Sequence, residues 1–216
     1  MTLPALYPIL DFSSFAAKAD PQRAMLEFAE QMLAGGATIL QYRDKISAPQ
    51  MFLSNARELR RVTQGKATFI INDRTDLALA CEADGVHLGQ DDLSPAAARK
   101  IFDSANQKSG HAIYSWIGFS THNLAQVSEA DALPLDYIAI GPVFATGSKA
   151  NPDPVVGLDG VRQARKATKR PLVAIGGITR QNCRQVREAG ADSVAVISDL
   201  LESPAKAVEE FLRLLR

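Results

Sequence analysis

The stretch ATFIINDRTDLALACEADGVHLG, residues 67–89, decides the fold class. It begins with one short apolar run, ATFIIN, and ends with another, GVHLG. Between the two runs, residues 75–80 have the pattern of a short helix. Apolar runs of strand length that flank a helix predict a βαβ unit, in which the two strands are parallel and buried on both faces.

The same unit recurs along the whole chain. Further apolar runs are ALYPIL (5–10), TILQY (38–42), WIGFS (116–120), YIAIGPV (137–143), PLVAIGG (171–177) and SVAVIS (193–198). Helices are predicted over residues 21–34, 48–63, 75–80, 95–102, 124–130, 158–167, 180–189 and 204–215, with Asp20, Ser94 and Ser203 as N-caps before prolines. This alternation predicts an α/β fold, a (β/α)8 TIM barrel that forms a single catalytic domain over residues 1–216. A doubly wound open sheet is the alternative, and the even spacing without a second-domain boundary disfavours it.

Composition excludes several classes of function. The 216 residues are 46% hydrophobic and 22% charged, as in ordinary globular proteins. Lys+Arg and Asp+Glu both number 24, so no overall basic field indicates a nucleic acid or membrane partner, and an anion site must be local. Cys81 and Cys183 lack the spacing of metal ligands and are predicted to be buried free thiols. The first ten residues have neither a basic region nor a long apolar run, which predicts a cytoplasmic protein.

Polar residues follow nearly every predicted strand at its carboxyl end, where parallel barrels place their active sites. Because these ends meet on one face of a barrel, the sequence predicts that their side chains converge on a single site. Together with the glycines and isoleucines beside them, the residues at these ends are Gln41, Arg43, Lys45, Asn72, Asp73, Gln90, Asp91, Asp92, Ser120, Thr121, His122, Thr146, Ser148, Lys149, Gly176, Gly177, Ile178, Thr179, Ile197 and Ser198.

The segment TILQYRDK, residues 38–45, aims two cations at the interior. With a period of two, Gln41, Arg43 and Lys45 fall on one face of the strand. An unpaired buried charge is costly, so this face needs an anionic partner. Surface ion pairs with Asp44 or Asp91 are the alternative.

Two carboxylates at neighbouring strand ends, Asp73 and Asp92, suit a Mg²⁺ ion, which binds through one or two carboxylates and through phosphate oxygens. Together with Arg43, Lys45 and Lys149, they predict a subsite for a magnesium diphosphate. Asp73 could instead cap the helix that follows it.

A second anion subsite is predicted after the seventh and eighth strands, where such barrels often hold a phosphate on backbone N–H groups. Gly176 and Gly177 allow close approach of the backbone, and Ser198 can add its N–H and hydroxyl. The alternative is that the two glycines only turn the chain.

The histidines and cysteines do not form a nucleophilic site. His87 lies within a predicted strand and is interpreted as a core or supporting residue. His122 follows a strand and is either an acid/base group or a helix cap. No Ser-His-Asp set and no cysteine at a strand end is present, so the sequence offers no protein nucleophile. One phosphate subsite and one diphosphate subsite then indicate transfer between two substrates. In this hypothesis, diphosphate leaves and a phosphorylated molecule attacks.

The chain resembles the thiamine-phosphate synthase family. The resemblance is carried, in order, by LYPILD, LQYRDK, FIINDRTDLALACEADGVHLGQDD, IGFSTHN, DYIAIGPVFATGSK, VVGLDGV, AIGGIT and VAVIS. It implies the joining of 4-amino-2-methyl-5-hydroxymethylpyrimidine diphosphate to 4-methyl-5-(2-phosphoethyl)thiazole, with thiamine phosphate and diphosphate as products. A homodimer is a further expectation from the resemblance.

The resemblance also implies roles for individual residues. The pyrimidine diphosphate would be held by Gln41, Arg43, Lys45, Asn72 and Lys149, with Ser120 against the pyrimidine. Mg²⁺ would be bound by Asp73 and Asp92. The thiazole phosphate would be held by Thr146, Ser148, Gly177, Ile197 and Ser198. Of these residues, Arg43, Lys45, Lys149 and Ser120 are the predicted catalytic set.

Three alternatives remain at this point. A thiazole tautomerase would share the barrel and the phosphate subsite, with His122 as its acid/base group. A non-catalytic protein that binds thiamine precursors would need no pair of metal-binding carboxylates. A different phosphate-sugar barrel enzyme would share only the fold.

Overall fold

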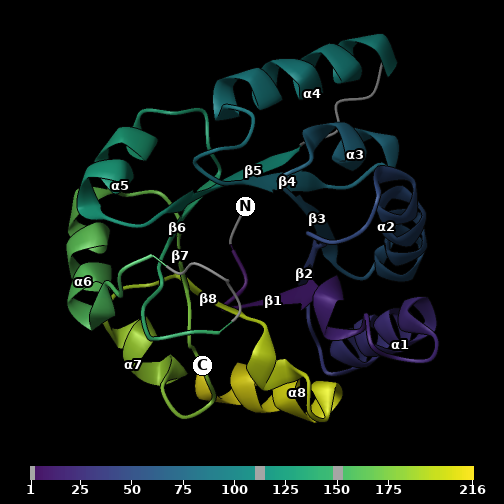
Figure 1. Cartoon of the computed structure of the whole chain (residues 1–216). Helices are drawn as coiled ribbons and strands as arrows, with labels where there is room; N and C mark the ends of the chain where they lie inside the picture. Colours follow the sequence, from purple (N-terminus) through teal and green to yellow (C-terminus); the bar gives the residue numbers. More distant parts are fainter. Residues whose placement is uncertain (1–2, 110–114, 148–152) are drawn as a thin grey trace.

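The computed structural model describes residues 3–109, 115–147 and 153–216. In this part of the chain, eight parallel strands form a closed barrel in sequence order, and the last pairs with the first through Leu6 and Val194. Figure 1 shows the ring of strands with the helices outside it. The strands are β1 (Leu6–Asp11), β2 (Ile39–Arg43), β3 (Thr68–Asn72), β4 (Gly85–Leu88), β5 (Trp116–Thr121), β6 (Tyr137–Ile140), β7 (Leu172–Ile175) and β8 (Ser193–Val196). The predicted (β/α)8 barrel is confirmed.

Helices follow the strands in strict alternation. They are α1 (Pro21–Ala34), α2 (Pro49–Thr63), α3 (Thr75–Ala80), α4 (Pro95–Ser109), α5 (Leu124–Asp131), α6 (Gly157–Ala167), α7 (Cys183–Glu188) and α8 (Pro204–Leu214), with short 3-10 helices η1 (Phe12–Ser14) and η2 (Ser198–Leu200). Across the described ranges, none of these helices has the length and apolar character needed to cross a membrane.

Two helix boundaries differ from the prediction by more than one residue. Helix α4 continues past the predicted end at residue 102. Helix α7 begins later than predicted, because the chain first makes a turn in which Asn182 and Thr179 bind each other. The Thr179 N–H donates to the side-chain oxygen of Asn182 at 2.8 Å, and the Asn182 N–H donates to the Thr179 carbonyl at 3.2 Å.

Two of the three predicted N-caps are confirmed. The side chain of Asp20 accepts a hydrogen bond from the Arg23 N–H at 3.0 Å, and the Ser94 hydroxyl accepts one from the Ala97 N–H at 3.3 Å. The prediction for Ser203 is wrong. Its backbone lies in the left-handed region with φ of 53°, and its side chain makes no capping hydrogen bond.

Buried side chains form two layers. One fills the space between strands and helices, and it includes Tyr42 and both free cysteines, Cys81 and Cys183, as predicted. The other fills the barrel interior and includes Tyr7 and Tyr137. Gly118 makes room for the Tyr137 ring, since a Cβ at Gly118 would lie 2.0 Å from the ring carbon Cζ. The large rings thus form a floor below the carboxyl ends of the strands.

Three aspartates that precede even-numbered strands bind the barrel to its helices at the amino-terminal end. Each accepts a hydrogen bond from the N–H of a residue near the start of the preceding strand and pairs with an arginine from a helix. A charge-assisted bond to a partly buried carboxylate is stronger than a neutral one. The three sets are Asp84 with Phe69 and Arg60, Asp136 with Ile117 and Arg99, and Asp192 with Leu172 and Arg165.

Candidate active site

A cavity of about 550 Å³ opens at the carboxyl ends of the strands, the end at which the sequence places its polar residues. Most of the predicted site residues line it, and they come from the ends of seven strands, β2 to β8, or the loops after them. The predicted residues Ser148 and Lys149 lie outside the described residues. Those brought together are Gln41, Arg43, Lys45, Asn72, Asp73, Gln90, Asp91, Asp92, Ser120, His122, Thr146, Gly176, Gly177, Ile178, Ile197 and Ser198.

Arg43 and Lys45 face this cavity and pair with carboxylates of neighbouring strand ends. Arg43 Nη1 pairs with Asp11 at the end of β1, and Lys45 Nζ pairs with Asp73 after β3. The alternative of surface pairs with Asp44 or Asp91 is therefore wrong. Asp44 faces away from the cavity and accepts hydrogen bonds from the Tyr42 hydroxyl at 2.9 Å and from the backbone of the following loop.

Asp73 and Asp92 lie close enough to influence each other. Burial raises the pKa of Asp92 above its ordinary value, and the adjacent Asp73 carboxyl raises it further. Asp92 is held by the Gly89 N–H, which donates to Oδ2 at 2.7 Å. Two neighbouring carboxylates, one of which has its charge disfavoured by burial and by the other, with Arg43 and Lys45 nearby, suit a divalent cation. No cluster of three or more His, Cys, Asp or Glu side chains of metal-binding geometry occurs in the described part of the chain.

The backbone of Asp73 directs its carboxylate to the cavity. Asp73 has a left-handed φ of 65°, and its N–H donates to the His87 carbonyl at 2.7 Å. Such a conformation is uncommon for a residue other than glycine and is often found at functional sites. Helix α3 begins at Thr75 without any side-chain cap, so the alternative that Asp73 caps this helix is wrong.

The opposite side of the cavity is built from backbone. Gly176 and Gly177 both have positive φ, 102° and 62°. A Cβ at Gly177 would lie 2.5 Å from the Ala145 carbonyl oxygen, so only glycine fits between this turn and the loop after β6. Ile197 and Ser198, at the start of η2, lie beside this turn on the cavity wall, and Thr146 lies on the loop opposite.

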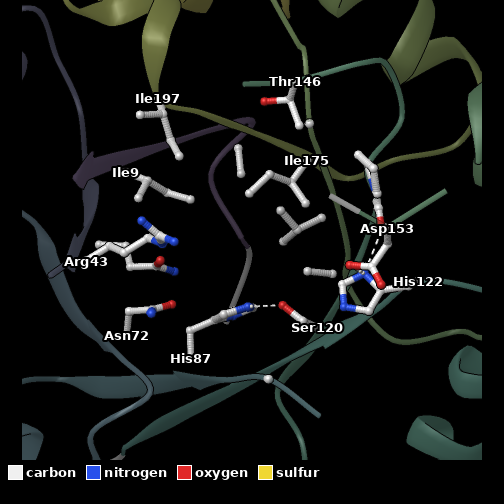
Figure 2. A pocket seen from close by; sticks show the side chains of 18 of the residues that line it. Ile9, Arg43, Asn72, His87, Ser120, His122, Thr146, Asp153, Ile175 and Ile197 are labelled. Carbon is white, nitrogen blue, oxygen red and sulfur yellow. Dashed lines mark hydrogen bonds and ion pairs between the residues drawn. The ribbon is translucent and has the colours of Figure 1, made fainter. Parts of the chain in front are cut away.

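Ser120 is held from below by a histidine. The Ser120 hydroxyl lies 2.8 Å from Nε2 of His87, and Figure 2 shows the two side chains pointing toward each other. His87 Nδ1 lies 3.0 Å from the hydroxyl of Tyr137. Burial lowers the pKa of His87 to about 4. His87 therefore lies in β4 as a buried supporting residue, the place that its position within a strand predicted.

His122 also faces the cavity. Its Nδ1 lies 2.8 Å from the Gly141 carbonyl oxygen and 3.4 Å from Asp153 Oδ2 (Figure 2). The alternative that His122 caps helix α5 is wrong, because Asn123 is the cap and accepts from the Gln126 N–H at 2.9 Å. Two neighbouring candidates, Thr121 and Thr179, do not line the cavity.

Sequence reasoning missed four residues that support the site: Asp11, Asp153, Tyr7 and Tyr137. Asp11 carried one signal, since it directly follows the first apolar run, where the carboxyl end of a strand is predicted. The tyrosines carried none, because strands buried on both faces show no alternation that separates inward from outward residues.

Comparison with known proteins identifies the family. The family model for thiamine monophosphate synthase matches residues 6–200. The thiamine-phosphate synthase of Koribacter versatilis is 51% identical to this chain, over 100% of this chain and 97% of that protein. That of Chloroflexus aurantiacus is 41% identical over 82% of this chain and 76% of that protein. The solved structure of thiamine phosphate pyrophosphorylase from Pyrococcus furiosus has a TM-score of 0.81 and 32% identity, over 98% of this chain and 95% of that one. The chain belongs to the thiamine monophosphate synthase family.

Proposed function

We propose that this protein is a thiamine-phosphate synthase, a transferase that joins 4-amino-2-methyl-5-hydroxymethylpyrimidine diphosphate to 4-methyl-5-(2-phosphoethyl)thiazole. The products are thiamine phosphate and diphosphate. The observation that carries the proposal is the pairing of two anion subsites in one cavity. Cations and carboxylates from β2, β3 and β4 line one side, and the glycine turn after β7 lines the other. Membership of the family supports the same reaction.

The diphosphate is assigned to the cationic side of the cavity. Arg43 and Lys45 bind its oxygens, together with Asn72 and, from the sequence, Lys149, whereas Gln41 is assigned to the pyrimidine of the same substrate. When the diphosphate binds, Arg43 and Lys45 exchange or share their present partners, Asp11 and Asp73. Because Asp11 is buried and stays beside Arg43, it keeps the guanidinium oriented.

Asp73 and Asp92 would hold a Mg²⁺ ion. When bound there, the ion supplies positive charge that stabilises the departing diphosphate. The raised pKa of Asp92 supports this assignment, because a cation held by these carboxylates would relieve their repulsion. The residues themselves contribute orientation: Asp73 through its left-handed backbone and Asp92 through the Gly89 N–H.

The thiazole phosphate is assigned to the backbone side. Thr146, Gly177, Ile197 and Ser198 would bind it, with Ser148 added from the sequence. Its anchor would place the thiazole nitrogen over the methylene carbon of the pyrimidine. Correct positioning of two reactants can supply roughly 7–11 kcal/mol of a barrier.

The proposed reaction is dissociative. The C–O bond between the methylene carbon and the diphosphate breaks, and the bonding electrons leave with the diphosphate. The electron-rich aminopyrimidine, held by Ser120 and Gln41, delocalises the cation that remains. The thiazole nitrogen then donates its lone pair to the methylene carbon. Protein groups that bind the leaving oxygens act as fixed electrostatic stabilisers.

The test is product formation from the two substrates, with Mg²⁺ and with excess chelator, followed by chromatography. Thiamine phosphate that forms only with Mg²⁺ is the expected result. Arg43→Met should lower turnover strongly, whereas Arg57→Met, which removes an exposed arginine from α2, should not. Absence of thiamine phosphate under all conditions would reject the proposal. The homodimer stays a prediction.

A second activity can be read from the same sample. His122 faces the cavity beside Asp153, in a position suited to proton transfer on a bound thiazole. If no thiamine phosphate forms, thiazole tautomerisation is measured. Tautomerisation that disappears in His122→Gln would establish the tautomerase and leave the cations at Arg43 and Lys45 without a role.

A further inference from the structure

A chain of hydrogen bonds crosses the floor of the cavity and joins two residues assigned to the pyrimidine. The Gln41 amide nitrogen donates to the Tyr7 hydroxyl at 3.2 Å, and the Tyr7 and Tyr137 hydroxyls lie 2.7 Å apart. From Tyr137 the chain passes to Nδ1 of His87 at 3.0 Å, and from Nε2 of His87 to the Ser120 hydroxyl at 2.8 Å. Five strands, β1, β2, β4, β5 and β6, contribute one member each.

The two tyrosines at the centre of this chain of hydrogen bonds are shielded from water. Tyr7 is 1% exposed and Tyr137 is 0% exposed, and they hold their rings edge to face with centroids 5.8 Å apart. Burial raises the pKa of both tyrosines and lowers that of His87 to about 4. Both ring nitrogens of His87 bond to neutral hydroxyls, and among the described residues no carboxylate pairs with this buried ring, so a protonated imidazole would lack a counter-ion and a neutral ring is favoured. A neutral imidazole has one N–H and one acceptor nitrogen. His87 therefore accepts a hydrogen bond at one ring nitrogen and donates one from the other, so the bonds on its two sides run in the same direction.

Neutrality leaves two directions, and one fits the bonds better. If Gln41 donates to Tyr7, then Tyr7 donates to Tyr137, Tyr137 donates to His87 Nδ1, and His87 Nε2–H donates to Ser120. In the reverse direction, with the Gln41 amide nitrogen toward Tyr7 as in this structure, Tyr7 would accept from both Gln41 and Tyr137, and its buried O–H would have no acceptor among the described residues. Buried polar groups are rarely left without a partner.

We propose that this chain of hydrogen bonds determines which group of the pyrimidine subsite donates a hydrogen bond to the substrate and which accepts one. Tyr7, Tyr137 and His87 are its positioning residues. Ser120, whose oxygen accepts from His87, presents its proton to the cavity. Gln41, whose amide nitrogen is bound to Tyr7, presents its carbonyl oxygen. The inference rests on the proposed function, since it concerns the same substrate.

This polarity matches the substrate. A 4-aminopyrimidine has ring nitrogens that accept and an amino group that donates. Ser120 at the end of β5 and Gln41 on β2 lie on different sides of the barrel, so a ring nitrogen would meet the serine proton and the amino group would meet the glutamine oxygen. A pyrimidine with a carbonyl in place of the amino group would place an acceptor against the Gln41 oxygen, and the site would reject it.

The first test removes one hydroxyl. Tyr137→Phe keeps the ring that packs on Gly118 and His87 but breaks the chain at its centre. We expect the KM for the pyrimidine diphosphate to rise roughly fivefold to tenfold, the loss of about one neutral hydrogen bond, while the KM for the thiazole phosphate stays unchanged. Tyr42→Phe is the matched control. It removes another buried hydroxyl, bonded to Asp44 and Asn55, and should leave both KM values unchanged.

The second test reads the proton positions directly and needs no turnover. In ¹⁵N NMR spectra of the wild-type protein, assigned by loss of the signal in His87→Gln, His87 should be neutral at pH 7 with its proton on Nε2. In Tyr137→Phe, Nδ1 loses its donor. A proton on Nδ1 in the wild type would overturn the proposed direction.

The outcomes separate this inference from the proposed function. Turnover by the wild type tests the proposed reaction. Only the comparison of variants tests the role of the hydrogen-bond chain. His87→Gln can still donate from its amide to Ser120, so it should keep a lower pyrimidine KM than His87→Leu. Equal pyrimidine KM values in wild type, Tyr137→Phe and His87→Leu would overturn the positioning role, even if the wild type makes thiamine phosphate.

Discussion

The ammonium group of Lys45, just beyond the end of β2, pairs with the carboxylate of Asp73, just beyond the end of β3. Lys45 also favours the charge of the adjacent Asp92, but burial and the Asp73 carboxyl outweigh it and keep the pKa of Asp92 raised. The site therefore contains repulsion between the carboxylates, and a bound divalent cation would remove it. Function and stability are in conflict at this point of the structure.

The first prediction concerns Asp92→Asn. We expect turnover to fall about 10²-fold or more, the size of effect seen when one preorganised electrostatic contact is lost. The midpoint of thermal unfolding should stay the same or rise, because the substitution removes repulsion with Asp73. Steady-state kinetics and thermal unfolding check both parts. Asp103→Asn, an exposed position on α4, is the control and should change neither. Unchanged turnover in Asp92→Asn would remove Asp92 from the site.

The second prediction concerns Gly177→Ala. The added Cβ would lie 2.5 Å from the Ala145 oxygen, and the alanine backbone would have to adopt a φ of 62°. The turn must therefore shift. The KM for the thiazole phosphate should rise, whereas the KM for the pyrimidine diphosphate should not. Gly65→Ala is the matched control: φ is 72°, but no atom lies within 4 Å of the new Cβ. It should cost only the backbone penalty of about 1–2 kcal/mol in stability and leave both KM values unchanged.

The sequence predicted the outline of this site because its signals are local. A period of two places Arg43 and Lys45 on the cavity face, and the positions of Asp73 and Asp92 follow from where the strands end. Their partners could not be predicted in the same way. The pair of Arg43 with Asp11 depends on the register between β1 and β2, which only the closed barrel fixes.

The floor of the site was invisible in the sequence for a different reason. Tyr7 and Tyr137 lie in continuous apolar runs, where inward and outward residues have the same character. Nothing in such a run shows that the two hydroxyls meet, since they are 130 residues apart in the chain. The late start of α7 was missed because the turn between Thr179 and Asn182 competes with the helix for the same backbone groups.

The third prediction is a pH dependence of stability. Burial lowers the pKa of His87 in the folded protein to about 4, below an ordinary value of about 6.5. The folded state therefore disfavours the protonated form, and the stability associated with neutral His87 is present above pH 6.5 and lost as the pH falls toward 4. This difference in pKa corresponds to about 3 kcal/mol. Urea unfolding at pH 7 and at pH 4.5 measures it, and His87→Gln should show a smaller loss over this range. An equal loss in both proteins would show that other groups cause it.

The last prediction concerns the amino-terminal end of the barrel, opposite the cavity. Asp136 accepts a hydrogen bond from the Ile117 N–H at 2.7 Å and pairs with Arg99 at 2.7 Å, so Asp136→Ala leaves a strand N–H and a partly buried guanidinium without this partner. Because breaking a partly buried charge-assisted set costs more than breaking a surface pair, we expect a loss of about 2–4 kcal/mol in the free energy of unfolding. Glu58→Ala breaks an exposed pair with Arg61 on α2 and should cost less than about 0.5 kcal/mol. Both KM values should be unchanged in Asp136→Ala at a temperature where it is folded, because the aspartate lies before β6 and the cavity lies after it. A KM change in the folded variant would mean that the two ends of the barrel are coupled. It would contradict the view that residues at the amino-terminal end serve stability alone while those at the carboxyl end serve function.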